Sequence, residues 1–145
     1  MKVLVQRVKS ASVAVHDDIV GQINHGLLLF VGVEKQDDAA VLVRMADKVS
    51  AYRLFADEHG KMNLNVREVE GSILAVSQFT LAADTKKGLR PGFSSAAPPD
   101  QAEPLFNQFV SKLRSRGLDI ATGRFGADMQ VELINDGPVT FMLEM

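Results

Sequence analysis

Alternating apolar and polar positions near the start of the chain predict three short strands, which precede a fourth, buried one. The alternation runs through residues 3–7 and 12–15, and it resumes over residues 19–23 after an Asp-Asp turn. In an extended chain such alternation places the apolar side chains on one face. Residues 27–33 form an unbroken run of apolar residues and one glycine, which is typical of a strand covered on both faces.

Helical spacing replaces this alternation in two later segments. The first helix is predicted from about residue 38 to residue 55, with the Asp37–Asp38 pair as its N-cap candidate. Its apolar positions recur every three or four residues: Val41, Met45, Val49 and Tyr52. The second helix begins between Asp100 and Pro104, because proline is tolerated in a first turn, and stops near Gly117. Its predicted core face comprises Leu105, Phe106, Phe109, Val110 and Leu113.

Strand patterns return between and after the two helices. The apolar segment at 73–76 predicts a strand within residues 71–80, and a Gly-, Ser- and Pro-rich loop follows at 86–98. Alternation at 129–133 predicts another strand, and a last strand follows at 139–143 after a turn at residues 136–138. An irregular segment is expected at Lys61 to Asn65.

Strands grouped around two helices favour an α+β fold over a doubly wound one. We expect a single domain over residues 1–145, in which mixed, mostly antiparallel sheets form an open barrel or roll with two main helices. A chain of 145 residues is long enough to bury an independent core.

Charge and residue types exclude several functions. The chain has 16 Lys and Arg against 18 Asp and Glu, a net charge of −2, so it is not a general nucleic-acid-coating protein, and no DNA partner is expected. Cysteine is absent, which excludes disulfides and a Cys nucleophile. His16, His25 and His59 lack the spacing of a zinc site, and the common nucleotide-binding motifs are missing. We therefore expect no metal and no cofactor.

No segment has the character of a membrane span or of a signal peptide. The longest apolar run has seven residues, 27–33, and polar residues interrupt the amino-terminal segment too early for a signal sequence. We expect no membrane partner, and the cytoplasm is the expected location.

The first candidate site lies at the end of the strand predicted within residues 71–80. Ser77, Gln78 and Thr80 place hydrogen-bonding side chains there, with Phe79 among them. Functional residues often lie where a strand gives way to a loop. Alternation predicts Ser77 and Phe79 on one side, and Gln78 and Thr80 on the other. A strand that merely ends at the surface has the same pattern.

The second candidate is the segment Asn135-Asp136-Gly137-Pro138. Glycine permits unusual backbone angles, proline fixes φ, and a bond preceding proline is where a cis peptide persists. Such a unit can direct two backbone carbonyls into a pocket as a rigid wall. A simple hairpin turn has a similar composition.

Three cations in the loop after the first candidate site form the third feature. Lys86, Lys87 and Arg90, with Lys61 upstream, are able to hold the phosphates of an RNA end. A solvated loop explains the same residues. The three histidines lie beside turn residues, and no Ser-His-Asp arrangement can be identified from spacing alone.

With these segments in view, the whole chain resembles the D-aminoacyl-tRNA deacylase family, also called D-tyrosyl-tRNA deacylases. The likeness covers the start at residues 1–8, the glycine-bounded stretch 26–32, and the segments 52–55 and 60–64. Two family motifs are present in order. Residues 77–81 fit Ser-Gln-x-Thr-Leu, and residues 135–140 fit the Gly-Pro motif with its Asn-x prefix.

This resemblance implies a metal-free hydrolase that removes D-amino acids, and also glycine, from tRNA while it spares L-aminoacyl-tRNA. It implies a homodimer whose active sites lie near the subunit interface and receive the aminoacyl-tRNA 3′ end. The Gly137–Pro138 bond is expected to be cis, and this segment is inserted from the partner subunit so that its carbonyls exclude an L side chain. Arg7 and Asn135 resemble family residues that accompany the Gly-Pro segment.

Two mechanisms of ester hydrolysis remain open. The backbone N–H groups near Phe79 and Thr80 are candidates for the oxyanion hole. Thr80 is one candidate nucleophile, but a Thr hydroxyl needs an adjacent base, and none is evident nearby. The favoured alternative is attack by water helped by the ribose 2′-hydroxyl of the terminal adenosine, with Ser77, Gln78 and Thr80 shaping the pocket.

Two other functional classes compete with the deacylase. One is a non-catalytic module on the same scaffold that binds an RNA end or a small ligand. The other is a hydrolase of small esters or D-aminoacyl peptides. The intact motifs favour the deacylase over the first, and the lack of a nucleophile–base pair or metal cluster disfavours the second.

Overall fold

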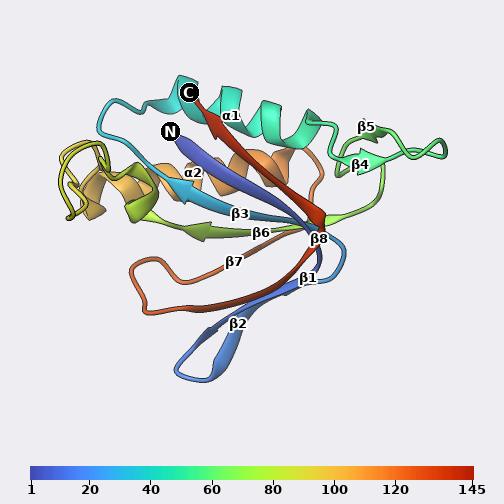
Figure 1. Cartoon of the computed structure of the whole chain (residues 1–145), viewed down its shortest axis with the longest axis horizontal. Helices are drawn as coiled ribbons and strands as arrows, with labels where there is room; N and C mark the ends of the chain where they lie inside the picture. Colours follow the sequence, from blue (N-terminus) through green and yellow to red (C-terminus); the bar gives the residue numbers. More distant parts are fainter.

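The main sheet is organised around its first strand, β1, which pairs with three other strands (Figure 1). The computed structural model describes all 145 residues. In chain order the elements, with η1 a 3₁₀ helix, are β1 (Lys2–Val15), β2 (Asp18–Ile23), β3 (Gly26–Gly32), α1 (Ala39–Ala51), β4 (Phe55–Ala56), β5 (Met62–Leu64), β6 (Ser72–Ser77), η1 (Phe79–Ala82), α2 (Pro99–Ser115), β7 (Ile120–Thr122) and β8 (Gln130–Glu144).

The six-stranded sheet has the order β2-β1-β3-β6-β7, and β8 pairs with β1. β1 runs antiparallel to β8 along nearly its whole length. On its other side it is antiparallel to β3 over its first half and to β2 over its second half. The β3–β6 and β6–β7 pairs are parallel. The prediction of a mixed, mostly antiparallel sheet with two main helices is confirmed.

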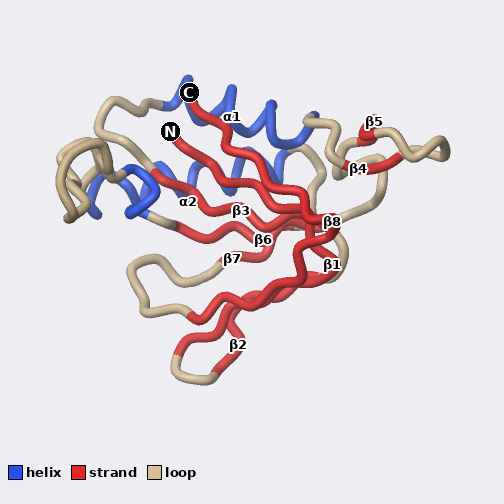
Figure 2. Tube along the Cα trace, viewed as in Figure 1, coloured by secondary structure: helices blue, strands red, loops and turns tan.

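The sheet curls until its two ends meet. β2 and β7 stand at opposite ends of the strand order, yet a side chain at Gly21 in β2 would collide with the carbonyl oxygen of Thr122 in β7. A glycine is therefore required where these two backbones approach. Figure 2 shows β1 and β8 bending together near their middle. The lower part of the sheet thereby curls into the predicted open barrel.

Each face of the sheet packs its own core. The larger core lies between the sheet and both helices, which cover the same face (Figure 1). The smaller core fills the inside of the curl. β1 contributes to both: Val3 and Val5 belong to the first core, whereas Val8 and Val13 belong to the second. The change of side coincides with a shift of its register against β8 between Gln6 and Val8.

The apolar run at β3 is explained by these two cores. Leu27, Leu29 and Val31 pack in the core beneath the helices, and Leu28 packs inside the curl. All four are fully buried. The sequence-based prediction that this strand is covered on both faces is confirmed.

The predicted helices are present with different limits. α1 ends at Ala51 rather than near residue 55, because Tyr52 adopts an extended backbone and Phe55 then pairs with Leu64 in the β4–β5 hairpin. Asp38 caps the helix by accepting from the Val41 N–H at 3.0 Å. α2 begins at Pro99, just before the predicted start. Gly117 follows α2 with a φ of +81°, as expected of a helix stop.

Several predicted strand limits are wrong, and pairing across the sheet is the reason. β1 is one strand rather than two, because β8 pairs with it from residue 2 to residue 14. β8 likewise continues through residues 136–138, where a turn was predicted, because β1 pairs with it on both sides of that segment. The strand predicted to reach residue 80 ends at Ser77 and becomes η1.

Three short strands escaped the sequence pattern. β4 lies at the predicted end of the first helix, β5 lies in a segment predicted to be irregular, and β7 was not predicted at all. β4 has two residues and the others have three each, too few to show a period of two. No helix of the structure is both long enough and apolar enough to cross a membrane.

Candidate active site

The Ser77–Thr80 segment lies where β6 ends. The parallel pairing with β3 finishes at Ser77, and the Gln78 N–H donates to the Val31 carbonyl at 2.8 Å. The chain then turns into η1, so that strand alternation ceases after Ser77. The Gln78 side-chain amide donates to the Thr80 hydroxyl. Ser77 and Gln78 are half-buried, whereas Phe79 and Thr80 are exposed.

A cavity of about 460 Å³ opens beside this segment. Its far side is formed by the start of α2 and by the loop between β7 and β8. Nine of its thirteen lining residues are hydrophobic. The lining residues are Val33, Val76, Ser77, Gln78, Phe79, Ala97, Pro99, Ala102, Phe125, Gly126, Ala127, Met129 and Val131.

The chemistry available in this cavity is limited. Among the lining residues there is no Asp, Glu, His, Lys or Arg, so a hydroxyl and an amide are the polar side-chain groups. The N–H groups of Phe79 and Thr80 begin η1, where a helix offers its first N–H groups no internal acceptor. Such groups can stabilise an oxyanion. The arrangement suits binding and electrostatic stabilisation better than proton transfer by a side chain.

The Gly137–Pro138 segment interrupts the middle of β8, and its peptide bond is cis. Gly137 has a φ of +131°, which side chains rarely adopt. A Cβ built there would lie 2.8 Å from Val139 Cγ2 and 3.1 Å from Arg7 Nη2. Glycine is therefore the residue that fits. Both Gly137 and Pro138 are exposed on the surface of this chain.

Arg7 holds the segment from β1. Its Nε donates to the Asp136 carbonyl at 3.1 Å, and its Nη1 donates to the Leu54 carbonyl at 2.8 Å. Its guanidinium also lies 3.6 Å from the Asp136 carboxylate. The planar Arg7 guanidinium thus connects β8 to the segment that follows α1. The flexible amine of a lysine would hold these two carbonyls in a less defined geometry.

Asn135 holds the same segment from within β8. Its side-chain oxygen accepts from the Val139 N–H at 3.0 Å, and its side-chain amide donates to the Thr140 hydroxyl at 2.9 Å. These two hydrogen bonds connect the residue two positions before Gly137 with the two residues that follow Pro138. Sequence analysis selected Arg7 and Asn135, and the structure places both in contact with the segment or its flanks.

Within one chain the two motifs do not meet. Ser77 pairs with Val31, which pairs with Val3 of β1, whereas the Gly137–Pro138 segment lies opposite residues 6–8 of β1. The motifs are therefore about four residues apart along the strands and three strands apart across the sheet. At ordinary strand dimensions this separation is roughly 20 Å.

The basic loop adjoins the first motif. Lys86, Lys87 and Arg90 are exposed, and the loop is closed at its base by two backbone hydrogen bonds between Asp84 and Gly92, at 2.7 and 3.0 Å. Immediately after it, Phe93 contacts Phe79 with ring centroids 5.2 Å apart. Lys61 is not part of this group, since it lies in the β4–β5 hairpin on the opposite side of the molecule (Figure 1).

Sequence analysis missed the apolar half of the cavity. Phe125 and Met129 come from the loop between β7 and β8, Ala102 from α2 and Val33 from just after β3, and nothing in their local pattern distinguishes them from core residues. Their common role depends on how the chain folds. The structure contains no group of three or more His, Asp or Glu side chains placed so that they could hold a metal ion.

The fold and this site define a class of α+β proteins in which a curled mixed sheet, covered by two helices, presents an apolar cavity beside a polar strand end. Residues 4–144 match the family described as D-Tyr-tRNA(Tyr) deacylase. The chain belongs to this family.

Individual relatives agree with that assignment. A D-aminoacyl-tRNA deacylase from Saccharophagus degradans is 61% identical over 145 residues, which is 100% of both chains. A solved structure named c-Myc DNA Unwinding Element Binding Protein is 42% identical with a TM-score of 0.95, covering 100% of this chain and 99% of that chain. A probable eukaryotic D-amino acid tRNA deacylase shares the fold at 19% identity, with a TM-score of 0.84 over 99% of this chain and 98% of the other.

Proposed function

We propose that the chain is a D-aminoacyl-tRNA deacylase, active as one domain over residues 1–145. It hydrolyses the ester of D-aminoacyl-tRNA, and of glycyl-tRNA mischarged on tRNA(Ala), and releases free tRNA and the amino acid. The family match over residues 4–144 supports this activity. The observation that carries it is the segment Ser77–Phe79 at the end of β6, which lines an apolar cavity without acid or base side chains.

The site favours hydrolysis by water over a covalent intermediate. Water attacks the ester carbonyl carbon, the bond to the ribose 3′ oxygen breaks, and the proton lost by water is delivered to that oxygen through the neighbouring 2′-hydroxyl. The N–H groups of Phe79 and Thr80 hold the oxyanion. Thr80 does not act as the nucleophile, because its hydroxyl accepts from the Gln78 amide, it is not among the residues that line the cavity, and no base lies there to activate it. It contributes a hydroxyl that orients the substrate at the rim.

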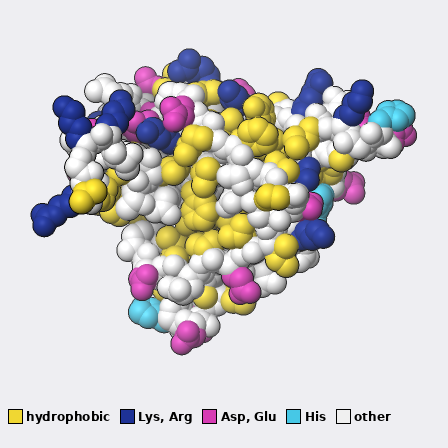
Figure 3. All heavy atoms as spheres, in the orientation of Figure 1, with side chains coloured by type: hydrophobic (Ala, Val, Ile, Leu, Met, Phe, Trp, Pro, Cys, Tyr) yellow, Lys and Arg dark blue, Asp and Glu magenta, His cyan; other side chains and the backbone are white.

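A complete active site requires two copies of the chain. The two motifs lie roughly 20 Å apart in one chain by strand geometry, so Gly137 and Pro138 of the partner subunit supply the wall beside Ser77. An apolar surface is available for such a homodimer. Figure 3 shows apolar side chains gathered over the centre of the sheet, and Ile134, Phe141 and Met142 of β8 are exposed.

Selection against L-amino acids follows from this wall. The Gly137 and Pro138 carbonyls of the partner subunit accept hydrogen bonds from the α-amino group of the substrate and occupy the space of an L side chain. A D side chain points elsewhere, and glycine has no side chain to exclude. Discrimination is thus achieved by steric exclusion of the wrong substrate.

The tRNA end enters between the cavity and the basic loop. The apolar cavity has the volume and the aromatic lining, Phe79 and Phe125, that suit the terminal adenosine. Lys86, Lys87 and Arg90 hold the preceding phosphates, and the exposed Phe79–Phe93 pair offers a face for an unpaired base. We expect the protein in the cytoplasm, where tRNA is charged.

A direct assay tests the activity. Purified protein is incubated with D-Tyr-tRNA and with L-Tyr-tRNA, with and without EDTA, and loss of the ester is followed. Rapid loss of the D ester alone, insensitive to EDTA, is expected. Binding of charged tRNA without turnover would instead support the non-catalytic RNA-end module, and turnover of small esters without tRNA would support a different hydrolase.

A further inference from the structure

The hydroxyl group of Thr140 lies close in sequence to the Gly137–Pro138 segment, and the proposed reaction does not use it. Thr140 is exposed on β8, directly opposite Gln6 of β1 (Figure 1). Its oxygen accepts from the side-chain amide of Asn135 at 2.9 Å and from the side-chain amide of Gln6 at 3.2 Å. Two donors from two different strands therefore converge on one hydroxyl oxygen.

These two hydrogen bonds determine what the hydroxyl can still do. The Asn135 side chain has one possible orientation, because its oxygen accepts from the Val139 N–H at 3.0 Å and its nitrogen is thus the atom that faces Thr140. A hydroxyl has two lone pairs and one proton. Both lone pairs are engaged by amides, so only the proton remains, and it has no acceptor in its own chain. Donors that act on a hydroxyl oxygen also make its proton a stronger donor.

The side chain of Thr140 lies on the face of the sheet that the helices leave uncovered. Phe141 lies opposite Val5, which packs in the core beneath the helices, and residues directly opposite in an antiparallel pair share a face. Alternation therefore places Thr140 and Met142 on the other face. Met142 is 44% exposed there. The proton of Thr140 is thus available on an open face, next to an exposed apolar side chain.

A row of apolar side chains crosses this face toward the candidate active site. In the strand order β8, β1, β3 and β6, the register places side by side Met142, Leu4, Phe30 and Val76. Val76 lines the cavity beside Ser77. A second copy of the chain that covers this row brings its own Thr140 to the interface together with its own Gly137–Pro138 segment.

We infer that Thr140 donates its hydroxyl proton across the interface between two copies of this chain, to an acceptor oxygen near the Ser77–Thr80 segment of the other copy. This inference rests on the proposed function, in which the Gly137–Pro138 segment lies beside Ser77 of the partner subunit. From Gly137 to Thr140 an extended chain spans at most about 11 Å, so the acceptor lies close to the same site. Thr140 is thereby a positioning residue for the wall, because it anchors β8 two residues after Pro138.

Dimer dissociation of the full chain, measured by analytical ultracentrifugation without tRNA, tests the hydrogen bond. We expect Thr140→Val, which keeps the shape of the side chain but removes the hydroxyl, to raise the dimer Kd about tenfold. Thr140→Ser, which keeps the hydroxyl, should bring the Kd back to within about threefold of wild type. Thr85→Val is the matched control, because Thr85 is exposed in the loop after η1, and it should leave the Kd unchanged. An unchanged Kd in Thr140→Val would overturn the inference.

Asn135→Asp tests the direction of the hydroxyl. The aspartate keeps an oxygen for the Val139 N–H and places a second oxygen, which can only accept, against Thr140. The proton of Thr140 then turns toward its own chain and is lost to the second copy. We expect a Kd about tenfold higher than that of wild type, with less than a further twofold rise when Thr140→Val is added. If the two effects multiply, the new charge weakens the dimer by itself, and the hydroxyl has no role as an intersubunit donor.

Deacylation kinetics separate positioning of the wall from stabilisation of one chain. At protein concentrations above the dimer Kd of every variant, Thr140→Val should lower the ratio of kcat/KM for D-Tyr-tRNA to that for L-Tyr-tRNA about fivefold, and Thr140→Ser should restore the ratio. A lower melting temperature with an unchanged Kd and an unchanged ratio would reduce Thr140 to a support within one chain and refute the inference.

Two further outcomes distinguish this inference from the proposed function. A monomeric wild type in which Thr140→Val raises KM for D-Tyr-tRNA would assign the proton to the tRNA and contradict a contact between subunits. If the wild type dimerises but hydrolyses neither ester, the deacylase proposal fails. The Kd values of Thr140→Val and Asn135→Asp then still decide whether the hydrogen bond exists, because they are measured without substrate.

Discussion

The two motifs of the site are held in different ways. The Gly137–Pro138 segment is fixed by side chains on both flanks: Arg7 binds the carbonyl before it, and Asn135 binds the N–H after it. The Ser77–Thr80 segment is fixed mainly by its backbone, through the pairing of β6 with β3, and its Gln78 side chain bonds within the segment.

This difference corresponds to different tasks. In the proposed function the Gly137–Pro138 segment is a wall that excludes L side chains, and such a wall works only if it does not yield, so its rigid support would determine selectivity. An oxyanion site needs unoccupied N–H groups, so the support of Phe79 and Thr80 has to leave those groups available. Substitutions in the two motifs should accordingly affect selectivity and rate to different degrees.

The largest effect is expected for Gly137→Ala. The added Cβ would lie 2.8 Å from Val139 Cγ2, at a φ that disfavours a side chain, so the wall must move. We expect kcat/KM for D-Tyr-tRNA to fall about 100-fold. Gly60→Ala is the control, because Gly60 also has a positive φ but no atom near the added Cβ. Equal losses of activity in the two variants would contradict a specific role of Gly137.

A smaller effect is expected for Arg7→Lys. A lysine amine cannot reach the Asp136 and Leu54 carbonyls with the geometry of the guanidinium. We expect about a tenfold loss in kcat/KM and about 1–3 kcal/mol in the free energy of unfolding, with measurable turnover of L-Tyr-tRNA. Arg53→Lys is the control, since Arg53 bonds Asn63 on the exposed hairpin. Unchanged discrimination between D and L esters would sink the proposed support of the wall.

Thr80→Ala tests the other motif. If water attacks with help from the ribose, the variant should keep more than about a tenth of its activity, because one hydrogen bond to the substrate is lost while the backbone N–H groups remain. A complete loss of activity in a folded, dimeric variant would point instead to Thr80 as the nucleophile. Thr85→Ala, in the exposed loop beyond η1, controls for nonspecific effects.

The spacing of apolar residues predicted those elements whose formation depends mainly on residues near one another in the chain. The run at 27–33 identified a strand buried on both faces, and the spacing of Val41, Met45 and Val49 identified α1. The continuity of β1 and of β8 was missed because it depends on their pairing with each other. Between Asp136 and Pro138 the composition of a turn was present, but β1 pairs with β8 on both sides of that segment, so the chain makes a local irregularity there instead of a hairpin.

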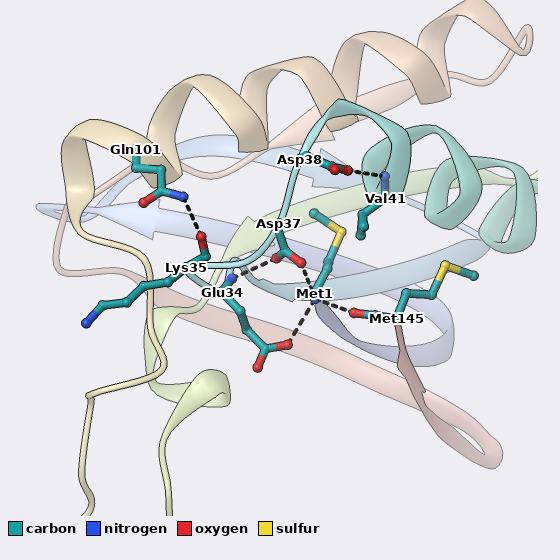
Figure 4. A network of polar contacts seen from close by, with 8 residues as sticks. All are labelled: Met1, Glu34, Lys35, Asp37, Asp38, Val41, Gln101 and Met145. Atoms are coloured by element: carbon teal, nitrogen blue, oxygen red, sulfur yellow. Dashed lines mark hydrogen bonds and ion pairs between the residues drawn. The ribbon is translucent and has the colours of Figure 1, made fainter.

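The residues of the candidate site also divide into those that the sequence pattern reveals and those that only the fold brings together. Its polar motifs could be selected from sequence because Ser77, Gln78 and Thr80 stand out at the end of an apolar strand. The apolar lining could not, because Phe125 lies in a loop without periodicity, Met129 belongs to an alternation typical of any strand, and only the fold brings them to the cavity. The polar contacts between Met1 and the residues Glu34, Asp37 and Met145, drawn in Figure 4, were likewise hidden, since these partners are 33, 36 and 144 residues away in the chain.

The smallest effect is expected in the basic loop, where a substitution tests contact with the tRNA and not the support of either motif. Lys87→Gln removes one exposed cation from the loop that follows the Ser77–Thr80 segment. We expect KM for D-Tyr-tRNA to rise about two- to threefold, with kcat unchanged and the salt dependence of log KM reduced by about 0.7. Lys61→Gln removes an equally exposed cation on the opposite side of the molecule and should change neither quantity. Equal effects of the two variants would mean that the tRNA does not follow this loop, because a purely overall change in charge acts alike at both positions.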